Sequence, residues 1–115
     1  VNAIAPFAWT RLIGTIPERE DQKERLDKVR KMHPSHIAPL VVFLGSDKAA
    51  CITGQIFGVR AKEIMLFSLP RPIRVIAKED GWIPQSVAEI IPDAWASAFI
   101  KLETTADVFP YDPLV

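Results

Sequence analysis

The sequence has little cysteine, no excess of charge and no long hydrophobic run, and each absence excludes a class of protein. Its single cysteine, Cys51, cannot form a disulfide within the chain and fits a reducing compartment, so we expect a cytoplasmic protein. The formal net charge is zero, which leaves no basic excess to bind nucleic acid or an anionic membrane. The longest apolar run, residues 37–44, is far shorter than the roughly 20 residues that a membrane-spanning helix needs. We therefore expect no nucleic acid and no membrane among its partners.

Motifs with a known chemical role are also scarce. The five glycines never approach the G-x-G-x-x-G spacing of a phosphate-binding loop, so a dinucleotide pyrophosphate would be held by other residues. His33 and His36 are the only suggestive pair of metal ligands, and no third ligand follows nearby. No nucleophile motif surrounds Cys51, which we expect to be a small buried hydrophobe. These patterns indicate no catalytic residue and no metal site.

The order of the apolar segments predicts an α/β fold for this chain of 115 residues, of which 49% are hydrophobic. Residues 1–5 are short and apolar, as in a strand of a parallel sheet, and Pro6 is expected to end this strand. Residues 55–59 predict the next strand. Because Val1 already lies within a predicted strand, we expect the chain to be a piece of a longer protein.

Two helices are predicted between these strands. Residues 17–33 place acids four positions before bases and have only a thin apolar edge, which is typical of a helix on the surface. Residues 37–44 are apolar on every side and predict a buried helix, with Ser35 as its cap and Pro39 in its first turn. A strand, helix and strand in this order form part of a parallel-sheet unit.

The second half of the chain is predicted to extend this sheet and then to leave it. Residues 64–67 and 73–76 have the composition of two strands, which would form a β arm. Residues 84–91 predict a helix that Pro92 interrupts before a second short helix. Residues 103–115 predict an extended tail, which we expect to pack on a surface because several of its side chains are apolar.

Two segments resemble the last part of the short-chain dehydrogenase/reductase family, namely residues 1–11, VNAIAPFAWTR, and residues 37–59, IAPLVVFLGSDKAACITGQIFGV. The family pattern joins an N-x-I-x-P-G strand end and a nearby threonine to an apolar helix with F-L-x-S-D and to T-G-Q before the final strand. The matching residues are Asn2, Ile4, Pro6, Thr10, Phe43, Leu44, Ser46, Asp47, Thr53, Gly54 and Gln55. The later PRPIR, GW and ADVF segments resemble a branch related to the dehydrogenase unit of the multifunctional β-oxidation enzyme.

The resemblance implies the C-terminal portion of a doubly wound, Rossmann-type parallel sheet. Residues 1–60 would complete an NAD(P)-binding domain, and residues 61–115 would form an extension with the β arm, helices and the tail. The resemblance also implies that the turn after the first strand lines the nicotinamide of NAD or NADP. The residues of this turn are Pro6, Phe7, Ala8, Trp9 and Thr10.

This turn departs from the family pattern at two positions. Phe7 stands where the family has glycine, and a phenylalanine cannot adopt positive φ cheaply. Thr10 comes about one residue earlier than the usual threonine, and it either binds the carboxamide or a phosphate of the cofactor or caps the following helix. Arg11 either reaches a cofactor phosphate or forms a surface salt bridge.

The resemblance implies that the whole protein interconverts a secondary alcohol and a ketone by hydride transfer, with 3-hydroxyacyl-CoA or a similar small-molecule substrate. The family's Tyr-x-x-x-Lys pair is absent here because the only tyrosine is Tyr111, so we expect these residues alone to be inactive. Residues 37–59 would either contribute to the interface of a homodimer or homotetramer or serve only as core. The alternative function is a non-catalytic protein-interaction module built on the β arm and the apolar tail.

Overall fold

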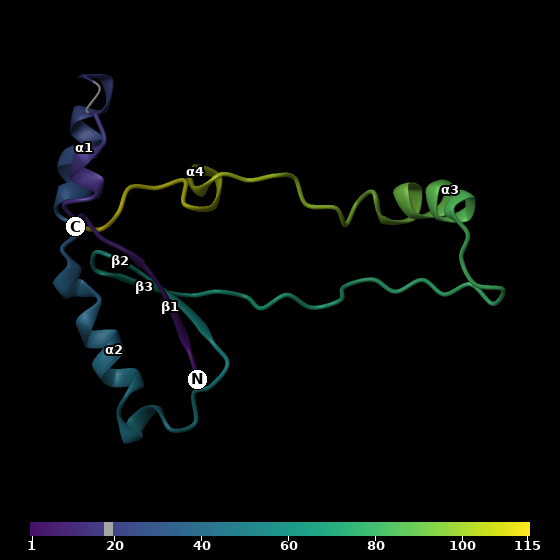
Figure 1. Cartoon of the computed structure of the whole chain (residues 1–115), viewed down its shortest axis with the longest axis horizontal. Coiled ribbons are helices and arrows are strands. Elements are labelled where there is room, and N and C mark those ends of the chain that lie inside the picture. The colour runs from purple at the N-terminus through teal and green to yellow at the C-terminus, as the bar shows by residue number, and fades with distance from the viewer. Residues whose placement is uncertain (18–19) are drawn as a thin grey trace. The chain divides into compact units, whose positions relative to one another are not determined.

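The computed structural model describes residues 1–17 and 20–115, which form two compact units (Figure 1). One unit contains residues 1–69 together with residues 111–115, and the other contains residues 70–110. The compact units therefore divide at a different place from the domains expected on either side of residue 60. The assignment of residues 1–60 to a cofactor-binding domain stays a prediction. Within the described residues, no helix has the length and apolar character needed to span a membrane.

Three strands form the sheet of the first unit, in the order β1, β2, β3. β1 (Ala3–Phe7) runs parallel to β2 (Ile56–Arg60), and β3 (Glu63–Leu66) pairs antiparallel with β2. The two strands predicted as members of a parallel sheet are therefore parallel neighbours, as an α/β segment requires. The doubly wound arrangement of a larger sheet stays a prediction.

The end of β2 lies at the centre of this unit. Val59 is 1% exposed, and the neighbouring Arg60 and Ala61 are 7% and 3% exposed. Ala61 has a φ of 51°, in the left-handed region, where the chain turns back toward β3. This short turn brings the ends of β2 and β3 together, so that Arg60 pairs with Glu63.

The bounds predicted for the first strand were wrong at both ends. β1 begins at Ala3 and continues through Pro6 to Phe7, with Pro6 opposite Val59. In the described sheet β1 has a neighbour on one side only, so the missing N–H of Pro6 can face the open side without removing a ladder hydrogen bond. Asn2 precedes the strand, and its side-chain oxygen accepts a hydrogen bond from the backbone N–H of Gln55 at 3.1 Å.

The charged segment forms a surface helix, as predicted. α1 (Lys23–Arg30) follows a single 3-10 turn, and residues 18 and 19 of the predicted helix lie outside the described residues. The Nζ atom of Lys28 lies 3.7 Å from a carboxylate oxygen of Glu24, which is one of the predicted pairs at four-residue spacing. Met32, just after the helix, is buried at 8% exposure and ends its thin apolar edge.

The apolar helix is present as α2 (Ala38–Leu44), with Pro39 in its first turn as predicted. Two further predictions about it were wrong. Ser35 lies inside a preceding 3-10 turn and does not cap the helix, whose N-terminal end has no side-chain cap. Only Leu40 is buried, while Val42 is 72% exposed. A helix that is apolar on every side needs neighbours on every side, and the described chain covers one side of α2.

Cys51 is exposed, which contradicts its expected burial as a small hydrophobe. It follows a 3-10 turn, Asp47–Ala49, in which Ala49 takes the buried position at 4% exposure. A turn presents only some of its side chains inward, and the inward position here belongs to the alanine.

The second unit contains α3 (Pro84–Trp95) and the short α4 (Thr105–Val108), and it corrects three predictions. Residues 73–76 form no strand, because they have no partner strand within residues 70–110 and follow two prolines that cannot donate to a ladder. Pro92 does not interrupt α3, which continues through it to Trp95, and the missing N–H of Pro92 removes one backbone bond, the one to the carbonyl of Ala88.

α4 was not predicted within the tail. Its signal is the spacing of Thr104 and Asp107, since the backbone N–H of Thr104 donates to the Asp107 carboxylate at 2.7 Å. Beyond α4, residues 111–115 rejoin the first unit, where the N–H of Lys62 donates to the carbonyl of Leu114 at 3.2 Å. The predicted contact of the tail with a surface is confirmed for residues 111–115, but backbone bonds make it, because Tyr111 and Leu114 stay more than half exposed.

Candidate functional site

The predicted cofactor residues form one continuous turn at the carboxyl end of β1, and we call residues 6–10 the strand-end turn. Ligands of parallel α/β sheets bind at this end of the strands. Pro6 and Thr10 are exposed, whereas the three residues between them are half-buried. Phe7 belongs to β1, and Ala61 is the only non-glycine residue with positive φ in the described part of the chain. Phenylalanine in place of the family's glycine therefore introduces no backbone strain here.

Trp9 anchors this turn to the segment that follows α1. Its backbone N–H donates to the carbonyl of Met32 at 2.8 Å. The guanidinium of Arg30 lies 5.7 Å from the centre of the indole ring, within the range of a cation–π contact. On another side a Cβ atom added to Gly14 would lie 3.3 Å from the indole, so the ring packs closely against the backbone. Because the Trp9 amide is engaged with Met32, it is not available as a donor to a ligand.

Thr10 lies three residues before a short helical turn, η1 (Ile13–Thr15), and its side chain has a weak link to this turn. The Oγ1 atom accepts from the N–H of Ile13 at 3.5 Å, near the outer limit for a hydrogen bond, and the carbonyl accepts from Gly14 at 3.0 Å. The hydroxyl proton of Thr10 is donated to no residue in the described part of the chain. The capping contact and a ligand contact are therefore compatible, and the ligand role stays a prediction, as it does for the exposed Arg11.

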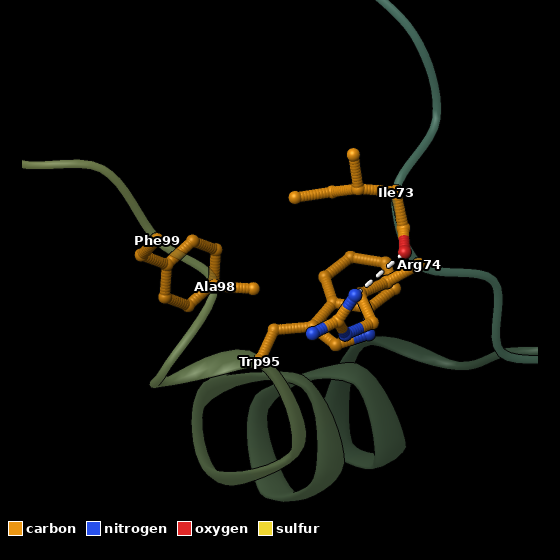
Figure 2. A pocket seen from close by; sticks show the side chains of 5 residues that line it. All are labelled: Ile73, Arg74, Trp95, Ala98 and Phe99. Atoms are coloured by element: carbon orange, nitrogen blue, oxygen red, sulfur yellow. Dashed lines mark hydrogen bonds between the residues drawn. The ribbon is translucent and has the colours of Figure 1, made fainter.

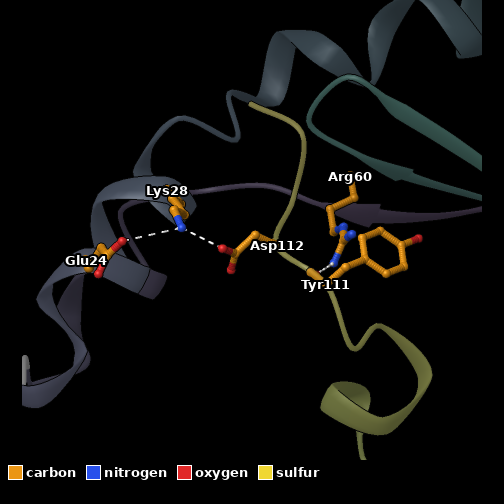
Figure 3. Close-up of polar contacts among 5 residues, drawn as sticks. All are labelled: Glu24, Lys28, Arg60, Tyr111 and Asp112. Carbon is orange, nitrogen blue, oxygen red and sulfur yellow. Dashed lines mark hydrogen bonds and ion pairs between the residues drawn. The ribbon is translucent and has the colours of Figure 1, made fainter.

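Arg60 is a buried cation next to this turn that the sequence analysis did not single out. Its Cα is opposite that of Phe7, and its Nε donates to Oε2 of Glu63 at 2.8 Å. Its Nη1 donates to the carbonyl of Tyr111 at 3.3 Å, and the guanidinium lies 4.7 Å from the centre of the Tyr111 ring (Figure 3). The short R-x-x-E spacing signals the pair with Glu63, but no local pattern signals a partner 51 residues away.

A second contact joins the tail to α1. The Nζ of Lys28 donates to Oδ2 of Asp112 at 2.5 Å, and the ammonium also faces Glu24 (Figure 3). The hydrogen bond from Lys28, reinforced by its charge, lowers the pKa of Asp112 below its ordinary value, and the same bond raises the pKa of Lys28. Both groups are open to solvent, so the pair contributes little to overall stability.

Two hollows lie away from the strand-end turn. One, of about 360 Å³, lies between the start of β1 and α2 and includes Ile4 and Leu44 in its lining. The other, of about 200 Å³, lies in the second unit, and Figure 2 shows its lining residues, Ile73, Arg74, Trp95, Ala98 and Phe99. Across residues 1–17 and 20–115, no group of three or more histidine, cysteine, aspartate or glutamate side chains is arranged to hold a metal ion.

No family model matches the chain. A 3-oxoacyl-acyl-carrier-protein reductase, FabG, from Thermotoga maritima is 37% identical over 62 residues, which cover 51% of this chain and 25% of that protein. The hydroxyacyl-CoA dehydrogenase ChsB1 from Mycobacterium tuberculosis is 29% identical over 100 residues, which cover 83% of this chain and 30% of that protein. The crystal structure of a short chain dehydrogenase from Mycobacterium avium aligns with a TM-score of 0.64 at 29% identity, over 90% of this chain and 30% of that one.

The parallel β1–β2 pair and the helices α1 and α2 between the strands define an α/β segment, and the relatives that it resembles are a reductase and two dehydrogenases. The comparisons confirm the resemblance to part of a short-chain dehydrogenase/reductase that the sequence predicted. It spans a quarter to a third of the length of the relatives it matches.

Proposed function

We propose that this chain contributes the nicotinamide side of the active site in an NAD(P)-dependent oxidoreductase that interconverts a secondary alcohol and a ketone. The observation that carries the proposal is the strand-end turn, which leaves the carboxyl end of a parallel strand with the hydroxyl of Thr10 exposed. The resemblance to a reductase and to two dehydrogenases supports the type of reaction.

The chemistry of the turn fits one part of the cofactor, the carboxamide of the nicotinamide. A carboxamide has an N–H donor and a carbonyl acceptor, so it needs both an acceptor and a donor from the protein. In this proposal a backbone carbonyl of the turn accepts and the Thr10 hydroxyl donates, whereas the amide of Trp9 is already bonded to Met32. When bound, the nicotinamide ring supplies the hydride donor or acceptor of the reaction.

The rest of the catalytic machinery lies outside these residues. No Tyr-x-x-x-Lys pair and no glycine-rich phosphate loop occur in the sequence, so proton transfer and phosphate binding require other groups. We therefore propose that the 115 residues alone do not turn over an alcohol or a ketone. The similarity to a hydroxyacyl-CoA dehydrogenase supports a 3-hydroxyacyl-CoA or a similar bulky hydroxy compound as substrate.

The exposed apolar side of α2 supports a homodimer or homotetramer as the assembled state. Val41 and Val42 are 51% and 72% exposed, and Phe43 beside them is 40% exposed. Adjacent apolar side chains on one helix are rarely left in water in a finished assembly. The proposal places the cofactor domain at residues 1–60 and the protein in the cytoplasm.

Replacement of Thr10 with valine tests the cofactor role in the whole protein that contains this chain. Loss of one neutral hydrogen bond is expected to weaken NAD(P)H binding about two- to tenfold. Valine keeps the branched shape of threonine, so the melting temperature without cofactor should change little. Binding is measured by titration of NADH or NADPH fluorescence, and stability by thermal unfolding of the same variant.

Thr15→Val is the matched control, because the Thr15 hydroxyl donates to the carbonyl of Leu12 at 2.7 Å within the same helical turn. This control is expected to lower the melting temperature slightly and to leave cofactor affinity unchanged. If Thr10→Val instead lowers the melting temperature without any change in affinity, Thr10 is a structural cap. A wild-type protein that binds neither NADH nor NADPH would favour the non-catalytic interaction module.

A further inference from the structure

The tail contacts the two elements that flank the strand-end turn, and the first contact is with the end of β2. The carbonyl of Tyr111 accepts a hydrogen bond from Arg60 at 3.3 Å, and the Tyr111 ring lies 4.7 Å from the same guanidinium. Arg60 is the partner of Phe7 in the parallel pairing of β1 and β2. Arg60, which is only 7% exposed, therefore links Tyr111 to Phe7 in the strand-end turn.

The second contact is with α1. Asp112 accepts from the ammonium of Lys28 at 2.5 Å (Figure 3), and the groups that hold Trp9 lie at the end of α1 and just after it. These groups are the guanidinium of Arg30, which faces the indole, and the carbonyl of Met32, which accepts from the Trp9 amide. The position of α1 thus determines the position of Trp9 in the turn.

Further hydrogen bonds hold the tail on the hairpin that β2 and β3 form. The N–H of Leu114 donates to Oε2 of Glu63 at 3.4 Å, the same oxygen that accepts from Arg60. The N–H of Lys62 donates to the carbonyl of Leu114 at 3.2 Å. Since the contacts of Tyr111 and Asp112 are made by adjacent residues, the tail holds the end of β2 and α1 at a defined separation.

The tail adds a second tie to the one that Trp9 makes with Met32 and Arg30. The connection from Thr10 to α1 is exposed along residues 10–17, and α1 itself has no buried residue. We propose that Tyr111–Leu114, the tail clamp, positions the strand-end turn for the cofactor by tying α1 to β2. This inference rests on the proposed cofactor role of the turn. Tyr111 and Asp112 are positioning residues, because they act through Arg60 and Lys28 rather than through contact with a ligand.

The test uses Asp112→Asn in the whole protein, since the substitution removes the charge and keeps the side-chain shape. An exposed ion pair is worth little, so the KM for NAD(P)H is expected to rise only about two- to fivefold. kcat should stay near the wild-type value, because the clamp affects how the turn binds and not the chemical step. The melting temperature without cofactor should be nearly unchanged.

Reversal of the pair, Lys28→Asp with Asp112→Lys, is expected to restore the KM, which a general loss of surface charge would not do. Asp93→Asn is the matched control, at an exposed carboxylate of α3 in the other unit. An Asp112→Asn enzyme with wild-type KM would overturn the clamp while leaving the cofactor role of the turn intact. A wild-type protein that does not bind NAD(P)H would overturn both proposals.

Discussion

The two compact units differ in how they use their apolar residues. In the first unit, strands far apart in sequence pair with each other, and the end of β2 is almost completely buried. In residues 70–110 no residue is buried, and several large apolar side chains are more than half exposed. These side chains include Ile73, Val75, Ile83, Phe99, Ile100 and Leu102. An apolar segment therefore forms a strand only where the same unit also supplies a partner strand.

The largest expected effect is loss of the buried cation of the first unit. Arg60→Met leaves the carboxylate of Glu63, which is only 18% exposed, without its main partner. Removal of one member of such a pair is expected to destabilise the unit by about 3 kcal/mol. The readout is native-state hydrogen exchange of the β2 amides, which separates this unit from α3.

Arg74→Met in the second unit is the matched control. Arg74 is exposed, and its Nη1 donates to the carbonyl of its neighbour Ile73 at 2.8 Å. The same chemical change is expected to cost less than about 0.5 kcal/mol there, because water can replace the lost bond. Equal losses at both positions would show that the contacts of Arg60 do not support the sheet.

The next largest loss of stability is expected when one glycine in each unit is replaced with alanine, and the physical cause differs between the two units. A Cβ atom at Gly58 would lie 2.9 Å from the Phe67 ring and 3.4 Å from Met65, so Gly58→Ala is expected to cost about 1–3 kcal/mol through crowding. Gly81 has open space around it but a φ of 76°, so Gly81→Ala is expected to cost about 1 kcal/mol through backbone strain.

Substitution of the same two glycines with asparagine separates crowding from backbone strain. Asparagine tolerates positive φ better than alanine, so Gly81→Asn should recover part of the loss, whereas Gly58→Asn should be worse than alanine. Thermal unfolding of the four variants checks the order. Recovery by asparagine at Gly58 would show that Phe67 moves aside and that packing there is loose.

The presence of partner strands in the first unit and their absence within residues 70–110 also explain which predicted helices and strands are found in the structure. Short apolar segments and a proline in the first turn were sufficient to predict β2 and α2, because such local signals agree with the tertiary structure there. The segment 73–76 has the composition of a strand but no partner, and α3 continues through Pro92 despite the loss of one backbone bond. Local sequence does not contain either fact.

The candidate site was predictable only in part for the same reason. Residues 6–10 were found through a contiguous motif that follows a strand. Arg60 and Asp112 were missed, since their partners Tyr111 and Lys28 lie 51 and 84 residues away in sequence. Contacts at such distances depend on the path of the tail, which has no periodicity to predict it.

The smallest expected effect concerns two aspartates with lowered pKa values, one in each unit. The pKa of Asp112 is lowered by the hydrogen bond from Lys28 and by the charge of that lysine. The pKa of Asp107 is lowered by hydrogen bonds from the backbone and then the side chain of Thr104, with no charged partner. Charge interactions at the surface are screened by salt, whereas a local capping hydrogen bond is not.

Salt should therefore separate the two carboxylates. In 1 M NaCl, where the screening length is about 3 Å, the pKa of Asp112 should move back toward its ordinary value of 3.8, and that of Asp107 should stay low. Both depressed pKa values imply stability that is present above pH 3.8 and is lost as the pH falls through the folded pKa. At high salt the tail clamp should thus lose the electrostatic contribution of Asp112 even at neutral pH, while the cap of α4 keeps its own. NMR titration of the carboxyl carbons at low and high salt measures both shifts in one sample. If the two pKa values respond equally to salt, the charge of Lys28 contributes little to the pKa of Asp112, and the Asp112→Asn variant should then have a wild-type KM.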